Sequence, residues 1–373
     1  MTLPLFFPAF LEAPPLEALP PPAPVFSWTR PREGLWRYHR VDYATRHELE
    51  ELATIISGGT ISRNIDSELK EQGTLPCVAP PVIGDDLIRI YYVMTDDQGA
   101  EYSLALATMH AVKSSAQYTA AAQTSTLNLY SALLTLQQSA LQRSLTIAAG
   151  SVAVTEAVSI CTTLALPVVA SASTRALTTD ASWDAGTSYL KIVNYLLDCA
   201  GFWSARVDGY GRVVMGAYEA PKDRAATWEF VSGPDCVFVP EVSLESDAFN
   251  TPNVCVLNCS NPAGVVTGSY TNADPASPYS TQTRGREIVL VETVTDAIDE
   301  DDLNTRAEKR LVAATAVTER VGIKHSFVPV TAGDVVKLTW GTHGLSMLAS
   351  VQSQDISLTP AGPTTASLKR VWQ

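Results

Sequence analysis

The side chains that could carry out catalysis do not form a recognisable set in this sequence. His47 precedes Glu48, but the second His that completes a zinc-protease helix is missing. There is no G-x-S-x-G nucleophile elbow and no phosphate-binding P-loop. Carboxylate pairs could act as acid and base, but they are uninformative in a chain with 39 Asp and Glu residues. We therefore predict no catalytic residue, no metal ligand and no bound cofactor.

An acidic run ahead of a predicted helix is the most obvious place for a cation. Its members are Asp296, Asp299, Glu300, Asp301 and Asp302. Asp301 and Asp302 stand where acidic side chains cap free N–H groups and complement the positive end of the helix dipole. We interpret the run as a solvated helix entry rather than a metal site.

The remaining metal-ligating residue types fit a hydrophobic core better than a site. His325 alternates in phase with Ile323 and Phe327, which predicts a core or interface histidine. Cys77 lies in a Pro-rich connection and is expected to be more exposed than the other cysteines. No C-x-x-C motif or nearby Cys and His pair completes a zinc set. The cysteines predicted to be small core residues are Cys161, Cys199, Cys236, Cys255 and Cys259.

Length, charge and hydropathy limit the classes of protein to which this chain can belong. The chain has 373 residues, a net charge of -13 and 46% hydrophobic residues, which suits two or three globular domains. Such an acidic chain repels nucleic acid, because binding to phosphates needs clustered Lys and Arg. No signal peptide and no membrane-spanning apolar run is apparent, so we expect folding in a cytoplasm.

The N-terminal segment, residues 1–30, differs from the rest because prolines interrupt its apolar residues. Proline removes N–H donors and favours extended chain, so we expect neither a helix nor a central strand. The segment is either a disordered tail or an extended arm that buries its aromatic side chains on this chain or on a neighbour. The aromatic residues predicted to contact a partner are Phe6, Phe7, Phe10 and Trp28.

Three further parts follow the arm. Residues 31–147 are expected to be β-rich, with a short helix over 45–56. Residues 148–222 have helical spacing and then a hairpin, which predicts a small α+β domain. Residues 223–373 are again β-rich. The strands predicted in the first β-rich part cover residues 60–69, 87–95, 102–107 and 127–136.

Local patterns specify the elements of the last two parts more closely. Helices are predicted over 154–164 and 187–200, and the loop 208–211 between hairpin strands 202–207 and 212–217 has turn chemistry. In the last part, the polar stretch 261–283 is predicted to be a long loop. A helix from residue 301 should pack across a sheet, and strands 321–327 and 335–340 should return on each other through a tight turn. The other strands predicted there lie within 228–257 and at 288–293, 347–358 and 366–371.

Three groups of segments, taken in order, carry a family resemblance. The first is WDAGTSYL at 183–190 with NYLLD, GFWS and VDGYGR at 194–198, 201–204 and 207–212. The second is FNTPNVCV at 249–256 with DPASPYS and RGR at 274–280 and 284–286. The third is the stretch 301–340, which includes TAGDVVKL at 331–338. Over residues 40–373 this order resembles the minor tail proteins, or baseplate hubs (tail hubs), of long-tailed bacteriophages.

The resemblance implies a structural virion protein at the tail tip, assembled in the host cytoplasm. It implies a predominantly β, α+β chain in which two β-barrel-like tube domains flank the small α+β domain. Three copies would form a ring, a homotrimer, around a channel that DNA passes without specific binding. The implied partners are a distal tail protein, a tape-measure protein and tail fibre or spike proteins. The resemblance does not cover the arm. Some hubs also carry a cell-wall hydrolase module, and no segment of this sequence resembles one.

Two alternatives stay open beside the hub. One is a receptor- or carbohydrate-binding tail module, which exposed aromatic side chains on the stretch 261–283 would favour. The other is an enzyme such as a glycosidase, which a cleft with two suitably spaced carboxylates would favour. Because the sequence contains no catalytic constellation, we predict that the protein is not an enzyme.

Overall fold

The computed structural model describes residues 33–78, 81–95, 101–118, 123–234, 236–246, 249, 251–261, 264–294, 296–297, 299–315 and 319–371. The arm at residues 1–30 lies outside the described residues, together with its predicted contact residues Phe6, Phe7, Phe10 and Trp28. Its contacts therefore stay predictions. Within the described ranges, no helix combines the length and apolar character needed to cross a membrane.

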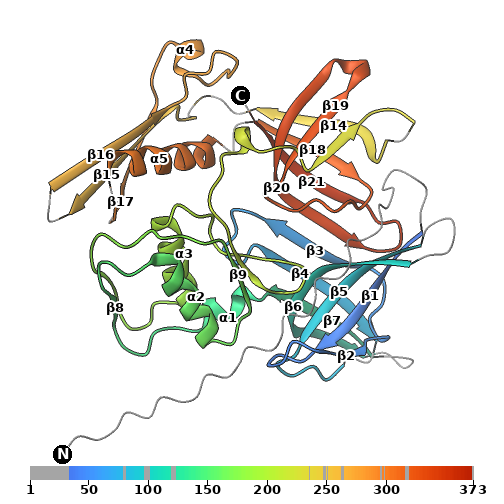
Figure 1. The fold of residues 1–373 in the computed structure, drawn as a ribbon. Coiled ribbons are helices and arrows are strands. Elements are labelled where there is room, and N and C mark those ends of the chain that lie inside the picture. Colours follow the sequence, from blue (N-terminus) through green and yellow to red (C-terminus); the bar gives the residue numbers. More distant parts are fainter. Residues whose placement is uncertain are drawn as a thin grey trace, which may run out of the picture.

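The first β-rich part consists of strands β1 to β7 (Figure 1), and its core comes from alternating residues of these strands. The predicted strand 87–95 is confirmed, and Ile88, Ile90 and Met109 join one buried cluster. The predicted strand 127–136 ends early, because Leu133 and Leu136 turn as a helix into the core of the middle part. The strands are β1 (Glu33–Val41), β2 (Glu48–Glu51), β3 (Gly59–Asn64), β4 (Glu71–Val78), β5 (Leu87–Thr95), β6 (Glu101–Tyr118) and β7 (Gln123–Ser131).

The helix predicted over 45–56 is wrong, because this stretch contains the edge strand β2. Asp42 accepts a hydrogen bond from the Thr45 backbone N–H at 2.6 Å, which closes a turn after β1. The chain then returns antiparallel to β1. Arg40 lies 3.3 Å from Glu50 across the two strands. Leu49 on this edge strand is 53% exposed, whereas Leu52 and Ile55 after the strand are buried in the core.

The middle part matches the prediction in its main elements. The predicted helices are confirmed, with Ser188 as the N-cap of the second and Gly201 in the left-handed conformation after its end. The predicted hairpin is shorter than expected, since only two or three residues pair on each side. The elements are α1 (Leu133–Gln138), β8 (Leu145–Ile147), α2 (Ala153–Thr163), β9 (Val168–Ala170), β10 (Ala181–Trp183), α3 (Tyr189–Cys199), β11 (Arg206–Val207), β12 (Val213–Met215) and the 3-10 turn η1 (Pro221–Asp223).

The last part contains two separate sheet regions. Strands β15, β17 and β16 form a three-stranded sheet, whereas the other strands belong to a larger sheet. The elements are β13 (Trp228–Val231), β14 (Phe238–Ser246), β15 (Val254–Asn261), β16 (Gly264–Thr271), α4 (Thr281–Arg284), β17 (Val289–Val294), α5 (Glu300–Ala314), β18 (Glu319–His325), β19 (Val335–Trp340), η3 (Gly341–His343), β20 (Leu345–Leu358) and β21 (Thr364–Arg370).

The long loop predicted over 261–283 is wrong, because β16 occupies much of it and pairs antiparallel along β15. The glycines of this stretch suggested a loop, but Gly268 instead allows close packing of β16 against α5. A Cβ at Gly268 would lie 2.3 Å from Cβ of Leu303, so only glycine lets helix α5 approach the strand this closely. The cluster beneath the helix contains Cys255, Leu257 and Leu311. The predicted helix-on-sheet packing is therefore confirmed, but the sheet is β16-β15-β17 rather than the one containing β18 and β19.

The predicted hairpin of strands 321–327 and 335–340 is also wrong. Strand β18 pairs with β14 and β21, while β19 pairs with β13 and β20. The turn residues between them therefore lead to a different position in the same large sheet. Both β strands bury alternate residues in one cluster, including Ile323 and Leu338, so the local alternation was right although the pairing was not.

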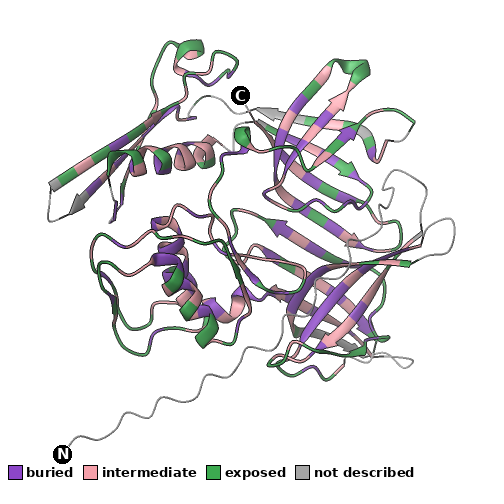
Figure 2. Cartoon of the chain, viewed as in Figure 1, coloured by how far each residue is buried: buried purple, intermediate pink, exposed green. Residues whose placement is uncertain are grey.

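One 13-stranded sheet runs through both β-rich parts. The junction is β20, a long strand that pairs with β21 on one side and with β3 on the other. Figure 2 shows buried and exposed residues alternating along these strands. The prediction of a predominantly β chain with a helical middle part is confirmed. The two-barrel arrangement and the domain limits 31–147, 148–222 and 223–373 stay predictions.

Candidate functional site

A cavity of about 740 Å³, which we call the central cleft, lies where the parts of the chain meet. Its walls come from the β3–β4 turn, the segment around α3 and β11, the α5 helix, the middle of β20 and the end of β21. Residues nearly three hundred positions apart in the sequence, such as Lys70 and Lys369, therefore face the same space. The aromatic and apolar side chains on these walls include Tyr195, Trp203, Tyr218 and Leu311.

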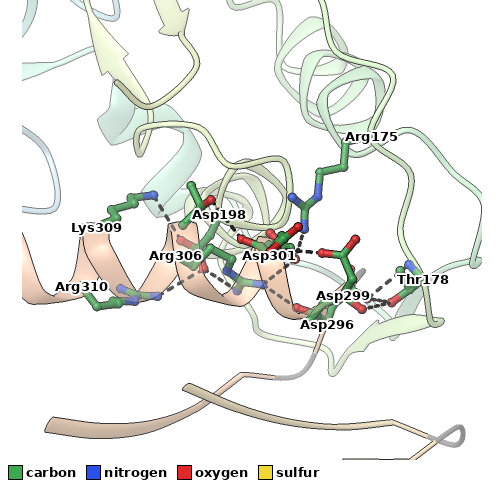
Figure 3. A network of polar contacts seen from close by, with 12 residues as sticks. Arg175, Thr178, Asp198, Asp296, Asp299, Asp301, Arg306, Lys309 and Arg310 are labelled. Carbon is green, nitrogen blue, oxygen red and sulfur yellow. Dashed lines mark hydrogen bonds and ion pairs between the residues drawn. The ribbon is translucent and has the colours of Figure 1, made fainter. Parts of the chain in front are cut away.

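A network of charged side chains joins the middle part to α5 beside this cleft (Figure 3). Asp198 near the end of α3 lies 2.9 Å from Arg306, 3.2 Å from Lys309 and 3.2 Å from Arg310. Burial on its own would raise the pKa of Asp198, but the three cations outweigh it and hold the pKa below its ordinary value. Asp198 is therefore a charged carboxylate that three side chains of one helix hold in place.

The same network corrects the interpretation of the acidic run. Asp299 is the N-cap of α5 and accepts a hydrogen bond from the Asp302 backbone N–H at 2.9 Å. The Asp302 side chain is only 5% exposed and pairs with Arg175 of the middle part. Asp296 is also buried and accepts hydrogen bonds from Thr178. The run is thus a solvated helix entry at Asp299, Glu300 and Asp301, as predicted, whereas Asp296 and Asp302 form a junction with the middle part.

Three cations on the cleft walls have no carboxylate partner among the described residues: Lys70, Arg206 and Lys369. The ammonium of Lys70 donates to the Ile65 carbonyl at 2.6 Å. The ammonium of Lys369 donates to the Val312 carbonyl and, at 3.3 Å, to the Thr315 hydroxyl. We call Lys70, Arg206 and Lys369 the cationic trio.

The partial burial of the cationic trio makes its charges costly. Burial lowers the pKa of Lys369 to about 7. Burial likewise lowers the pKa of Lys70, although the nearby carboxylate of Asp66 opposes this effect. The guanidinium of Arg206 makes no hydrogen bond to any described residue and lies 5.8 Å from the Trp203 ring centroid. Unpaired cations on the wall of a partly apolar cavity favour an anionic occupant.

Other charges at the cleft are already balanced. Arg63 lies 2.8 Å from Glu71, and both side chains are less than 10% exposed. Arg63 also donates to the Leu106 carbonyl at 2.6 Å. Lys222 lies 2.6 Å from Glu308 on α5. These pairs are internal to the fold, whereas the cationic trio has no carboxylate within ion-pair distance among the described residues.

No group of three or more His, Cys, Asp or Glu among the described residues is placed to hold a metal ion. His325 is buried, as predicted, with Nδ1 2.7 Å from the Ser326 carbonyl oxygen and its ring 5.0 Å from that of Phe230. Burial lowers its pKa to about 4.

The cysteine prediction needs two corrections, since Cys77 is buried in β4 and Cys236 is half-buried. All six cysteines are free thiols.

Sequence reasoning missed the central cleft because its members carry no local pattern. Lys70 follows a turn, Arg206 lies in a two-residue strand and Lys369 lies in the last strand. Only the helix cations Arg306, Lys309 and Arg310 share an element, and their spacing does not reveal that one carboxylate from α3 meets all three. The walls combine cations, hydroxyls and aromatic rings, a set that suits the binding of an anionic group.

Comparison with solved structures shows that this fold is similar to that of several tail proteins. A tail protein from Neisseria meningitidis MC58 matches with a TM-score of 0.65 and 12% identity, over 90% of this chain and 96% of that one. The 43 kDa tail protein of prophage MuSo2 from Shewanella oneidensis matches with a TM-score of 0.63 and 11% identity, over 91% of this chain and 98% of that one. Prophage tail protein gp18 from Listeria monocytogenes matches with a TM-score of 0.53 and 11% identity, over 89% of this chain and 94% of that one.

Sequence comparison adds nothing to this likeness, because no protein-family model and no curated protein matches the chain. The structural matches nevertheless span nearly the whole of each tail protein. The chain therefore has the fold of these tail proteins, which confirms at the level of the fold the resemblance that its sequence carries.

Proposed function

We propose that this chain is a structural hub protein of a bacteriophage tail tip. The observation that carries the proposal is the extent of the shared fold, which covers about nine-tenths of this chain and more than nine-tenths of two prophage tail proteins. In the proposed assembly, three copies form a ring around a channel. The ring joins a sixfold tail tube or distal ring to threefold tip or fibre proteins.

Unpaired sheet edges support assembly with neighbours. The path of the 13-stranded sheet ends at β2 and at β14, so each of these strands has one side without a strand partner among the described residues. Such edges are usually covered or paired, and a closed ring pairs them without runaway growth. Two β-rich parts per chain, repeated in three chains, offer six similar positions to a sixfold tube. The distal tail protein, the tape-measure protein and fibre or spike proteins are the partners of this proposal.

An exposed apolar face supports the same role. On the three-stranded sheet, Val265, Val289 and Val291 are 70%, 48% and 59% exposed. Their chain neighbours Val266 and Leu290 pack against the cluster beneath α5, so the three valines lie on the opposite face of the sheet. An apolar sheet face of this kind fits contact with another protein.

We propose that the protein has no catalytic activity and that DNA passes the ring without specific binding. The net charge of -13 fits such a conduit, because an acidic wall does not retain phosphates. The carbohydrate-binding alternative gains little support from the stretch 261–283. There, Tyr279 is buried and Tyr270 lies 3.3 Å from the Lys222 ammonium.

A density map of intact tails containing this chain tests the assembly. We expect three copies on the tail axis, with the two β-rich parts around the channel and the middle part outside. One copy, six copies or a position away from the axis would overturn the hub. Incubation of the purified chain with cell-wall and glycoside substrates tests the absence of activity, and turnover that a single carboxylate substitution abolishes would refute it.

A further inference from the structure

The central cleft is a preformed space lined by more basic than acidic side chains. The cationic trio lines it without a carboxylate partner within ion-pair distance among the described residues, while the neighbouring cations Arg63, Lys222 and Lys309 each have one. Lys70 and Lys369 donate to main-chain carbonyls, and the carboxylate of Asp66, which also lines the cleft, attracts them only from beyond ion-pair distance. Asp334 attracts Arg206 in the same way. A half-buried cation without a close counter-charge is costly, so a bound carboxylate would stabilise this wall.

The other walls of the cleft specify what must accompany the carboxylate. Trp203 and Tyr195 are half-buried on its lining, and the half-buried Val207 contributes apolar surface from β11. A volume of about 740 Å³ lies in the range of cavities that hold a ligand of several residues or a small molecule. The suited occupant is therefore a short apolar segment that carries carboxylates, not a free small anion.

The N-terminal arm has this chemistry in its sequence. Glu12 and Glu17 are the only charged side chains in residues 1–29. They occur in two similar stretches, Leu-Glu-Ala-Pro-Pro at 11–15 and Leu-Glu-Ala-Leu-Pro at 16–20. Proline restricts an unbound chain to extended conformations, which lowers the entropy lost when such a segment binds.

Chain length permits the contact in either of two ways. β1 begins at Glu33, which is sixteen residues after Glu17 in the sequence. Sixteen extended residues span up to about 50 Å, and the crosslinking experiment below distinguishes the cleft of the same copy from that of an adjacent one. The chain thus supplies an acidic, apolar segment in addition to a cavity with the complementary charge.

We propose that the central cleft binds the N-terminal arm, with the carboxylates of Glu12 and Glu17 held by the cationic trio. The arm's leucine side chains then lie against the aromatic and apolar walls. This proposal does not rest on the tail-tip function, because it depends only on the cleft and the arm of this chain. It assigns a docking site to the arm, whose aromatic residues remain free to contact a further partner.

Carbodiimide crosslinking of the full-length chain tests the contact directly, because the reagent joins a carboxylate to an amine only where the two touch. Mass spectrometry of the digest should find Glu12 or Glu17 linked to Lys70 or Lys369. The exposed lysines Lys191 and Lys324 serve as internal controls. A mixture of isotope-labelled and unlabelled protein then separates links within one copy from links between copies. Arm carboxylates linked only to the exposed lysines, or not linked, would overturn the proposal.

Proteolysis provides a second measurement that does not require a reactive lysine. Chymotrypsin cleaves after the arm's Phe residues, and a docked arm is protected from it. We expect Arg206→Met and the double variant Glu12→Gln/Glu17→Gln to be cleaved in the arm several-fold faster than the unchanged chain. Arg143→Met, which removes an exposed cation of the middle part, is the matched control and should have no effect. Equal cleavage in all four proteins would contradict the proposal, whichever proteins the tail tip contains.

Discussion

Asp198 Oδ2, near the end of α3, lies 2.9 Å from Nη2 of Arg306 on α5. This ion pair connects the core of the middle part to the helix that covers the three-stranded sheet. Arg306 is only 6% exposed, and it also donates to the Asp296 carbonyl. The orientation of α5 against the middle part therefore depends on a carboxylate more than a hundred residues away in the sequence.

Asp198→Asn should destabilise the chain, because it leaves Arg306, Lys309 and Arg310 without their shared counter-charge. Loss of one partner of a buried ion pair costs about 3–5 kcal/mol, and partial exposure of this site puts the expected loss near the lower end. Denaturant unfolding monitored by circular dichroism measures the change. Asp184→Asn, an exposed carboxylate of the same part, is the control.

The stabilisation from Asp198 should depend on pH in a defined direction. Its pKa is held below its ordinary value of 3.8, so its contribution is complete above that pH and is lost as pH falls through the folded-state pKa. The difference in unfolding free energy between the unchanged chain and Asp198→Asn should therefore shrink only in strong acid. A difference that already disappears near pH 6 would contradict this assignment.

Leu311→Asp should destabilise the packing of α5 on the three-stranded sheet. Leu311 is 2% exposed within the cluster that also holds Leu257 and Leu303. An unpaired charge there should cost several kcal/mol, measured as a lower denaturant midpoint. Ala313→Asp adds the same charge at an exposed position of the same helix and should cost less than about 1 kcal/mol. Similar losses in the two variants would show that α5 does not pack as described.

His325 should make the chain sensitive to acid. Burial lowers its pKa from 6.5 to about 4, so the folded state binds fewer protons than the unfolded state between these values. Stability is therefore full above about pH 6.5 and falls as pH approaches 4, by up to about 1.4 kcal/mol per pH unit. His325→Phe keeps an aromatic ring beside Phe230 and should remove this part of the pH dependence. Parallel acid profiles of the two proteins would refute the prediction.

Removal of residues 1–30 should leave folding intact but weaken assembly. The arm's Phe and Leu residues would form an exposed apolar surface unless they bind this chain or a neighbour. We expect an unchanged circular dichroism spectrum together with reduced incorporation into tails, measured by complementation of a deletion. The full-length quadruple variant Phe6→Ser, Phe7→Ser, Phe10→Ser and Trp28→Ser tests the aromatic contacts alone. An unfolded truncated chain would place the arm in the protein's own core instead.

The sequence by itself determined the elements whose signals are local. The alternation of 87–95 predicted β5, and apolar residues at helical spacing predicted α2 and α3. The acidic residues before Leu303 predicted the start of α5, although the N-cap is Asp299 rather than Asp301 or Asp302. A helix period or a cap is a relationship among residues a few positions apart, so it can be recognised from one sequence.

Only the tertiary structure decided which elements meet. Residues 48–51 became a strand because β1 offered an edge with cross-strand charge partners, and the Gly-containing stretch at 264–271 became one because it lies beneath α5. The burial of Asp302 and the convergence of Lys70, Arg206 and Lys369 have the same origin. Pairing energy, burial and charge compensation depend on neighbours that are distant in the sequence, and no local pattern specifies those neighbours.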